Sequence, residues 1–209
     1  MEGLTARSTR REDLIEIARI HKESYPPGHF INEFSISTIA KFYGTFLDGN
    51  RDIIFLLCVL ENKIVGFALG GRIDSLAMAK KKFIKEEMHN LIIEAYLKLM
   101  SFNFSFFKKL FPRVKFNLGN SIKHINKDIN RNEDVWSLLS IAVSNKVKRK
   151  SIGQKLLQSF EKEIRGFGVQ KYRLSVVKDN VAAINFYIKN GFYVNNETKN
   201  SISFMKQII

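Results

Sequence analysis

Cysteine, proline and tryptophan are scarce in this chain of 209 residues, which has one, three and one of them respectively. The single cysteine, Cys58, excludes an intrachain disulfide, so a reducing, cytoplasmic setting is the default expectation. Cys58 lies in the apolar run Ile53 to Leu60, which favours a buried thiol over a nucleophile. Residues Met1 to Arg7 lack the apolar run of a signal peptide and predict a short first strand.

Long apolar segments are also missing. The stretch Leu99 to Phe107 has nine uncharged residues between Lys98 and Lys108, whereas a membrane-spanning helix needs about twenty. The sequence therefore does not predict a transmembrane segment there.

Acidic residues are few: 20 Asp and Glu stand against 34 Lys and Arg, which gives a net charge of +14. A basic balance favours nucleic acid, anionic membrane or phosphorylated ligands as partners. No zinc-finger, RNA-recognition or helix-turn-helix pattern occurs, so we do not expect nucleic acid. Apolar residues make up 45% of the chain, which supports a substantial core and argues against disorder.

The most informative stretch is Ser137 to Phe160, where an apolar strand runs into a basic cluster and then an amphipathic helix. The cluster comprises Lys146, Lys148, Arg149 and Lys150, and the turn that follows is Ser151-Ile152-Gly153. The first N–H groups of a helix have no partner within it and lie at the positive end of its dipole. Such a place suits a polyphosphate.

A second block begins 27 residues after Gly153 and reads Asn180-x-x-Ala183-Ile184-x-Phe186-Tyr187-x-Lys189-x-Gly191-Phe192. Asn180 is a suitable helix N-cap, and Gly191 suits a helix C-terminus in the left-handed region.

Together these blocks resemble the GCN5-related N-acetyltransferase (GNAT) superfamily. Its phosphate loop, Arg/Gln-x-x-Gly-x-Gly/Ala, follows a strand that ends in Ala-Val, as Ile141-Ala142-Val143 does here. Lys148 and Ser151 depart from that loop and Gly153 matches it, while the second block matches at every defined position. Because Ser151 has a Cβ and is less free at positive φ, the loop is expected to hold a pyrophosphate less closely there.

The resemblance implies that acetyl-CoA is the co-substrate and that no metal is needed. It implies cofactor binding by three groups of residues: Ile141, Ala142 and Val143; Lys148, Arg149, Lys150, Ser151, Ile152 and Gly153; and Asn180. It also implies that Tyr187 is the acid that protonates the departing thiolate, since a phenol with a pKa near 10 is neutral at pH 7 and can donate. The alternative role for Tyr187 is packing and hydrogen bonding alone.

The general base stays open. Some family members carry a Glu six residues before the position of Val143, where this chain has Ser137. The other candidates are Glu133, Asp134, His124 and a water chain to bulk solvent.

The fold class that follows is α/β (α+β): a mixed, largely antiparallel sheet with helices on both faces, splayed where the cofactor enters. One domain is expected over residues 1–209. Helices are expected at Asp13 to Tyr25 and Ser37 to Leu47, and strands at Asp52 to Leu60, Lys63 to Gly70, Tyr172 to Val177, Phe192 to Asn195 and Ser201 to Ile208.

Residues Arg72 to Asn132 form an insertion between the third and fourth strands, with helices expected at Asp74 to His89 and from Leu91 to about Phe111. The insertion holds thirteen Lys and Arg against five Asp and Glu, a net +8, together with eight Phe and Tyr. It could be an ordinary helical layer, a lid over the acceptor, a homodimer interface or a surface that contacts anionic membrane.

The predicted reaction is acetyl transfer to a primary amine by direct attack in a ternary complex. The acceptor ranked first is a small, anionic molecule, a nucleotide-linked amino sugar, on a weaker likeness to members associated with bacterial surface glycans. A small amine such as an antibiotic, a protein N-terminus and a non-catalytic acetyl-CoA-binding module are the alternatives.

Overall fold

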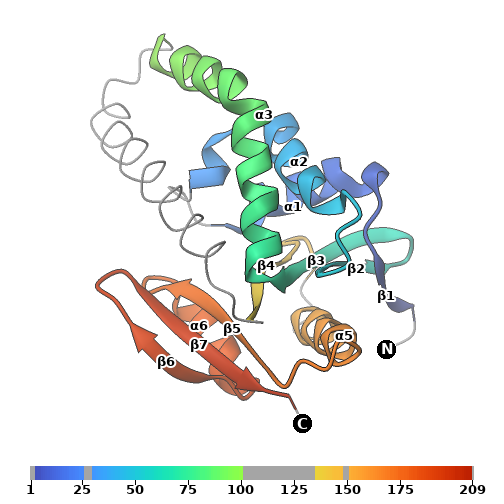
Figure 1. The fold of residues 1–209 in the computed structure, drawn as a ribbon. Coiled ribbons are helices and arrows are strands. Elements are labelled where there is room, and N and C mark those ends of the chain that lie inside the picture. The colour runs from blue at the N-terminus through green and yellow to red at the C-terminus, as the bar shows by residue number, and fades with distance from the viewer. Residues whose placement is uncertain (1–2, 26–29, 101–134, 148–150, 209) are drawn as a thin grey trace. The chain divides into compact units, whose positions relative to one another are not determined.

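The computed structural model describes residues 3–25, 30–100, 135–147 and 151–208 (Figure 1). Contacts within the chain divide it into two compact units. The sheet unit comprises Met1–Thr9, Arg51–Ile73 and Glu133–Ile209, and the helical unit comprises Arg10–Asn50 and Asp74–Asn132. The prediction of a single domain over residues 1–209 stays a prediction.

The sheet unit is built on one seven-stranded sheet with the strand order β1-β2-β3-β4-β5-β7-β6. Its strands are β1 (Leu4–Ser8), β2 (Ile53–Leu60), β3 (Lys63–Arg72), β4 (Trp136–Val143), β5 (Lys171–Val177), β6 (Tyr193–Glu197) and β7 (Ser201–Gln207). Every neighbouring pair is antiparallel except β4 and β5, which run parallel. The predicted mixed, largely antiparallel sheet is confirmed.

The connection of β2 and β3 has the tight turn that its two residues favour. Glu61 and Asn62 both adopt positive φ, at 49° and 61°. A two-residue hairpin whose residues both have positive φ matches the right-handed twist of the strands, and Asn accepts this conformation more readily than most residues. The predicted strand pair around this turn is therefore confirmed.

Two helices of the sheet unit pack on this sheet. α5 (Ile152–Arg165) contacts β1 to β4 and buries Leu156 and Phe160 completely. α6 (Val181–Lys189) places Tyr187 against Phe204 of β7, with ring centroids 6.3 Å apart. Burial of such side chains is the main source of stability, at roughly 1.5–3 kcal/mol for each large apolar group.

The helical unit contains three α-helices and three 3-10 helices among its described residues. They are η1 (Arg11–Asp13), α1 (Leu14–Ser24), η2 (Phe30–Glu33), α2 (Ile36–Gly44), η3 (Thr45–Leu47) and α3 (Ile73–Met100), whose first residue belongs to the sheet unit. α1 and α2 pack together through buried side chains, among them His21, whose Nδ1 lies 2.7 Å from the hydroxyl of Tyr43. Phe42 of α2 meets Phe83 of α3 edge to face, at 5.2 Å between centroids.

The helix α3 corrects the prediction for the insertion. Two helices were expected, with a break near Asn90, but α3 continues unbroken through that position. The amide of Asn90 donates to Oε2 of Glu87 at 2.6 Å, so its side chain bonds one turn back. That bond removes the competition with the backbone through which Asn usually weakens helices. The remaining part of the second predicted helix, residues 101–111, lies outside the described residues.

Carboxylates of α3 bond to residues of α2 and to Ser35, the N-cap of α2. The backbone N–H and the hydroxyl of Ser35 donate to Glu94 at 2.9 and 2.7 Å, and the hydroxyl of Thr38 also donates to it. Lys41 donates to Glu87 at 2.9 Å. An acidic group near a helix N-terminus interacts favourably with the dipole, so these bonds hold α3 against α2.

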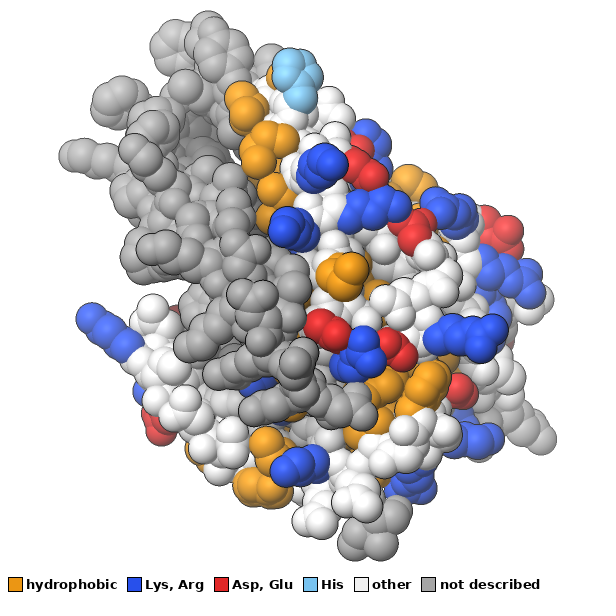
Figure 2. Space-filling view, viewed as in Figure 1, with side chains coloured by type: hydrophobic (Ala, Val, Ile, Leu, Met, Phe, Trp, Pro, Cys, Tyr) orange, Lys and Arg blue, Asp and Glu red, His pale blue; other side chains and the backbone are white. Residues whose placement is uncertain are grey.

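None of the helices in the described ranges combines the length and the apolar character that crossing a membrane requires. Figure 2 shows Lys and Arg side chains spread among fewer Asp and Glu side chains over the described part of one face.

Candidate functional site: the separation of β4 and β5

The parallel strands β4 and β5 separate soon after they begin. Trp136 pairs with Tyr172 and Ser137 with Arg173, and no later residue of β4 pairs with β5, although the structure describes both strands in full. On its other side β4 remains paired with β3 as far as Val143. The edge of β4 that carries Ile141, Ala142 and Val143 therefore diverges from β5, as the predicted splay requires. A separated strand edge can bond to an extended ligand because peptide N–H and C=O groups are strong, obligatory hydrogen-bonding groups.

The chain leaves β4 in a turn that leads to the start of α5. The N–H of Ser144 donates to the carbonyl of Val65 at 2.9 Å, and the N–H of Val147 donates to the carbonyl of Ser144 at 3.1 Å. Lys146 is exposed there. The predicted phosphate-binding residues Lys148, Arg149 and Lys150 lie outside the described residues.

Ser151 precedes α5 with φ −90° and ψ −9°, an ordinary right-handed conformation. The backbone does not use positive φ at this position, so the Cβ of Ser151 meets no conformational cost there. The expected looser hold on a pyrophosphate stays a prediction. Its side chain does not cap the helix, and the first turn carries no acidic residue. The first turn of α5 therefore keeps the positive end of its dipole uncompensated by a carboxylate.

At Gly153 the start of α5 lies close to α6. An ideal Cβ on Gly153 would lie 3.3 Å from Cε2 and 3.4 Å from Cζ of Phe186, and 3.9 Å from Cγ2 of Val143. The absence of a side chain thus lets the ring of Phe186 close onto the start of α5. Three segments that the sequence predicted to act together, the end of β4, the start of α5 and α6, meet at this point. Ile152 is fully buried beside it, so only its backbone can face a ligand.

Asn180 caps α6 as predicted. Its Oδ1 accepts from the N–H of Ala183 at 3.1 Å, and Gly191 at the other end has φ +84°. The cap satisfies one of the N–H groups that a helix start leaves open. The local geometry of this motif is confirmed.

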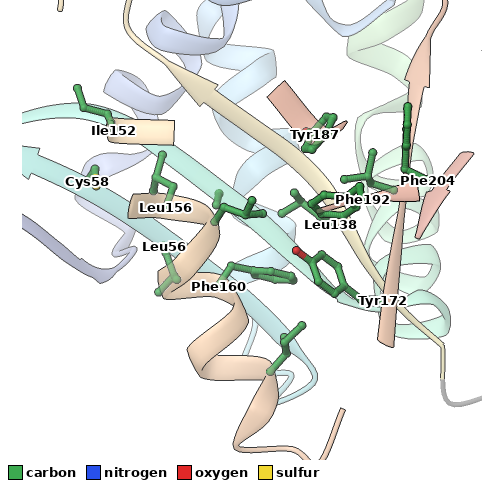
Figure 3. Close-up of a cluster of buried hydrophobic side chains, with 14 of the residues drawn as sticks. Leu56, Cys58, Leu138, Ile152, Leu156, Phe160, Tyr172, Tyr187, Phe192 and Phe204 are labelled. Atoms are coloured by element: carbon green, nitrogen blue, oxygen red, sulfur yellow. The ribbon is translucent and has the colours of Figure 1, made fainter. Parts of the chain in front are cut away.

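Tyr187 lies in a cluster of buried hydrophobic side chains of the sheet unit, which is shown in Figure 3. Its side chain is 7% exposed, and its ring meets those of Phe186 and Phe192 edge to face at 5.3 and 5.2 Å. The ring is therefore held firmly by its neighbours. The role of its hydroxyl stays a prediction.

The same cluster holds a buried polar group that sequence reasoning missed. The hydroxyl of Tyr172 donates to Oε1 of Glu161 at 2.7 Å, and Nζ of Lys206 donates to the same oxygen at 2.6 Å. Burial, and next the bond to Glu161, raise the pKa of Tyr172 above its usual range. Tyr172 is thus a neutral donor that helps a buried carboxylate stay hydrogen-bonded.

Phe186 was also missed as a site residue. It stands at an undefined position of the second motif, and no spacing rule connects it with Gly153. The only sequence feature that pointed to Phe186 was its place beside Tyr187, and aromatic residues in helices usually belong to the core.

The candidates for a general base gain no support from their positions. Ser137 is half-buried in β4 and offers only a hydroxyl. Glu133, Asp134 and His124 lie outside the described residues. Among the described ranges, no three His, Cys, Asp or Glu side chains gather in a way that could hold a metal.

Comparison with known proteins agrees with this geometry. Residues 118–192 match the family described as "Acetyltransferase (GNAT) family". No curated protein matches the sequence significantly.

Solved structures share the fold over nearly the whole chain. PaiA N-acetyltransferase from Thermoplasma acidophilum, in complex with coenzyme A, is 17% identical, with a TM-score of 0.60 and 99% of each chain covered. Ard1 from Thermoplasma volcanium is 15% identical, with a TM-score of 0.57 and 99% of each chain covered. The ribosomal-protein-S18-alanine N-acetyltransferase from Escherichia coli is 18% identical, with a TM-score of 0.55, 98% of this chain and 94% of that chain covered. The family match over residues 118–192 and the shared fold agree with the resemblance predicted from the two motifs.

Proposed function

Because this chain has the GNAT fold and matches that family over residues 118–192, we propose that it transfers the acetyl group of acetyl-CoA to a primary amine. The amine attacks directly while both substrates are bound. The observation that supports this most is the separation of β4 and β5 beside the closely packed start of α5.

The fit to acetyl-CoA rests on two features of the chain. The edge of β4 at residues 141–143 diverges from β5 and can bond to an extended pantetheine arm. The first turn of α5 offers N–H groups, a positive dipole end and no acidic side chain to a diphosphate. Lys148, Arg149 and Lys150 directly precede that turn in the sequence and would add positive charge.

The chemistry requires a neutral amine, a polarised thioester carbonyl and a proton for the departing sulfur. A backbone N–H of β4 can donate to the thioester oxygen. The hydroxyl of Tyr187 would donate to the leaving thiolate, and the packing of its ring would hold it in place. The base is left to water or to a residue not yet identified.

For the acceptor, the proposal is an anionic molecule, a nucleotide-linked amino sugar. The net +8 of residues 72–132 supports it, since this charge lies outside the loop before α5. Within α3, Lys81 and Lys85 are exposed and form no ion pair among the described residues, whereas Lys82 is paired with Asp48. Lysines of this kind can bind phosphate oxygens through charge-assisted bonds.

A protein amine is the second candidate, because the Escherichia coli neighbour acts by its name on an alanine of a ribosomal protein. At 18% identity that likeness extends to the fold alone. The acceptor assay must therefore include peptides.

The test follows thiol release from acetyl-CoA with three sets of acceptors: an amino sugar, the same sugar linked to a nucleoside diphosphate, and short peptides with free N-termini. We expect the diphosphate-linked sugar to give the highest kcat/KM, with a decline as salt screens exposed charges over about 8 Å at physiological ionic strength. The Lys81→Ala/Lys85→Ala variant should raise KM for that acceptor and leave coenzyme A affinity unchanged.

Equal kcat/KM for the free and the linked sugar would exclude diphosphate recognition. A higher rate with peptides would favour a protein acceptor. Binding of coenzyme A without thiol release for any amine would point to a non-catalytic module.

A further inference from the structure

A groove runs between the edge strand β1 and the helix α5, both within the sheet unit. Its volume is about 540 Å³. The lining comes from three elements: Leu4, Thr5, Ala6, Arg7 and Ser8 of β1; Leu56 of β2; and Lys155, Ser159, Lys162 and Glu163 of α5. None of these residues belongs to the separation of β4 and β5, so the groove is a different place from the proposed acetyl-CoA site.

One wall of the groove is an open strand edge. β1 is the first strand of the sheet and pairs only with β2 among the described strands. The N–H of Thr9 donates to the carbonyl of Phe55 at 2.9 Å, in the same register that pairs Ser8 with Leu56. Since hydrogen-bonded pairs alternate along antiparallel strands, the N–H and C=O groups of Leu4, Ala6 and Ser8 point away from β2.

The side chain of Arg7 partly covers this edge, because its Nη1 donates to the carbonyl of Ser8 at 3.0 Å. The outward N–H and C=O groups of Leu4 and Ala6 are not covered by a side chain in this way among the described residues. An uncovered strand edge is a template for pairing with another chain.

The floor of the groove is apolar. Leu56 is buried, and Leu4 and Ala6 are partly buried and pack against the main core cluster. An extended chain lying beside β1 would therefore cover apolar surface as well as bond to the edge.

The opposite wall is positively charged. Lys155, Ser159 and Lys162 follow one another at spacings of four and three residues, which places them on one face of α5. Both lysines are exposed and neither forms an ion pair among the described residues. The one acid of this wall is Glu163, so two positive charges stand against one negative charge.

We infer that this groove binds an extended acidic peptide segment of a partner protein, which adds to β1 as a further antiparallel strand. Strand addition between a sheet edge and a helix uses main-chain bonds for affinity and side-chain pockets for specificity. The alternating donors and acceptors of Leu4, Ala6 and Ser8 match a peptide backbone, which neither a lipid headgroup nor a nucleic acid provides. Lys155 and Lys162 select acidic side chains on the face that meets α5. The inference does not rest on the acetyltransferase proposal.

The probe is a fluorescein-labelled hexapeptide of alternating Val and Glu, blocked at both ends, measured by fluorescence anisotropy. Two matched peptides serve as controls: one has Gln for every Glu, and the other carries N-methyl groups at alternate residues. We expect both to bind more weakly, the first because it lacks charge and the second because it cannot complete the ladder. Hydrogen exchange at the amide of Ala6 should slow when the parent peptide binds.

Variants of the protein separate backbone from charge. Ala6→Pro removes an outward N–H, and proline is tolerated on an edge strand whose N–H faces solvent. Lys155→Glu/Lys162→Glu reverses two charges of the wall, and Lys63→Glu/Lys171→Glu reverses two exposed lysines elsewhere in the sheet unit. We expect the wall reversal to weaken binding of the peptide about fourfold or more, because two attractive pairs become repulsive, and the control reversal to change it little.

If the wall reversal and the control reversal weaken peptide binding equally, the inference is overturned. The peptide would then bind by unspecific attraction to a basic protein. Equal affinity of the N-methylated and parent peptides would exclude strand addition, whether or not Ala6→Pro folds. Vesicles of phosphatidylcholine with phosphatidylglycerol provide a last comparison. If they bind through Lys155 and Lys162 while the peptide does not bind, the groove is a lipid-contact surface and the inference is wrong.

Discussion

A Cβ atom added to Gly153 would lie 3.3 Å from Cε2 of Phe186. Contacts at this distance are tighter than ordinary packing, so a side chain at position 153 would require the ring to shift by a few tenths of an ångström. The start of α5 and the ring of Phe186 in α6 are thereby packed against each other at the proposed cofactor site.

We predict that Gly153→Ala destabilises the protein by about 1 kcal/mol through overpacking, which lowers Tm by about 2–4 °C in a chain of this length. Coenzyme A should also bind more weakly, since the first turn of α5 must shift. Phe186→Leu should relieve most of both losses in the double variant, as measured by thermal unfolding and calorimetry. Additive losses would show that the ring is not the cause.

The much larger side chain in Gly153→Trp should block binding of coenzyme A. Unchanged affinity for coenzyme A in a folded Gly153→Trp variant would place the cofactor elsewhere.

Tyr187→Phe should lower turnover while coenzyme A affinity changes little, because the ring keeps its contacts with Phe186 and Phe192. General acid catalysis accounts for about 10²- to 10⁴-fold in rate. Steady-state kinetics at saturating acetyl-CoA measure the effect. A drop of less than about threefold would mean that the hydroxyl is structural or that the thiolate leaves unaided.

Tyr172→Phe is the matched control for that experiment. It removes another buried hydroxyl of the same cluster, the one that donates to Glu161. We expect a loss of about 1–3 kcal/mol in the free energy of unfolding, because a buried carboxylate loses a donor. Turnover per folded molecule should be preserved, and a loss as large as that of Tyr187→Phe would contradict a special role for Tyr187.

Asn180→Ala should reduce the free energy of unfolding by about 1 kcal/mol, since the N–H of Ala183 loses its acceptor. Asn180→Asp keeps an acceptor oxygen at the positive end of the α6 dipole and should cost little. Chemical denaturation of the two variants measures the difference. If both lose the same amount, capping is not what Asn180 contributes.

The buried thiol predicts a loss of stability at alkaline pH. Burial, opposed weakly by Lys155, raises the pKa of Cys58 to about 11, whereas an unfolded thiol titrates near about 8.5. A raised folded pKa contributes stability that is complete below the unfolded pKa and is lost as pH rises toward the folded one. The free energy of unfolding should therefore fall by up to about 1.4 kcal/mol per pH unit between these two values.

Cys58→Ala isolates that contribution. The variant should be less stable at pH 7, because it loses buried volume, but its stability should fall less between pH 8.5 and 10 than that of the parent protein. Denaturant titrations at several pH values measure both slopes. Tyr172→Phe serves as a control, since a tyrosine titrates near pH 10 when unfolded and should not alter the slope below it. Parallel curves for the parent and Cys58→Ala would rule out the thiol as the source.

Local chemistry let the sequence determine much of the site. Asn180 caps α6 and Gly191 adopts positive φ because both choices depend on residues within one helical turn. The strands around Glu61 and Asn62 were equally predictable, since a two-residue turn leaves few conformations open. The fold class followed from two motifs at their known spacing.

The tertiary structure alone decided which distant side chains meet. Gly153 and Phe186 are 33 positions apart, and Glu161 gathers Tyr172 and Lys206 from sequence separations of 11 and 45 residues. Nothing local distinguishes Phe186 from an ordinary core aromatic, and Asn90 looked like a helix break until its amide was seen to bond to Glu87. The open edge of β1 and the lysines of α5 likewise become one groove only when the sheet has formed. Such contacts depend on how elements pack, and packing is set by the shapes of many side chains at once and not by any short pattern.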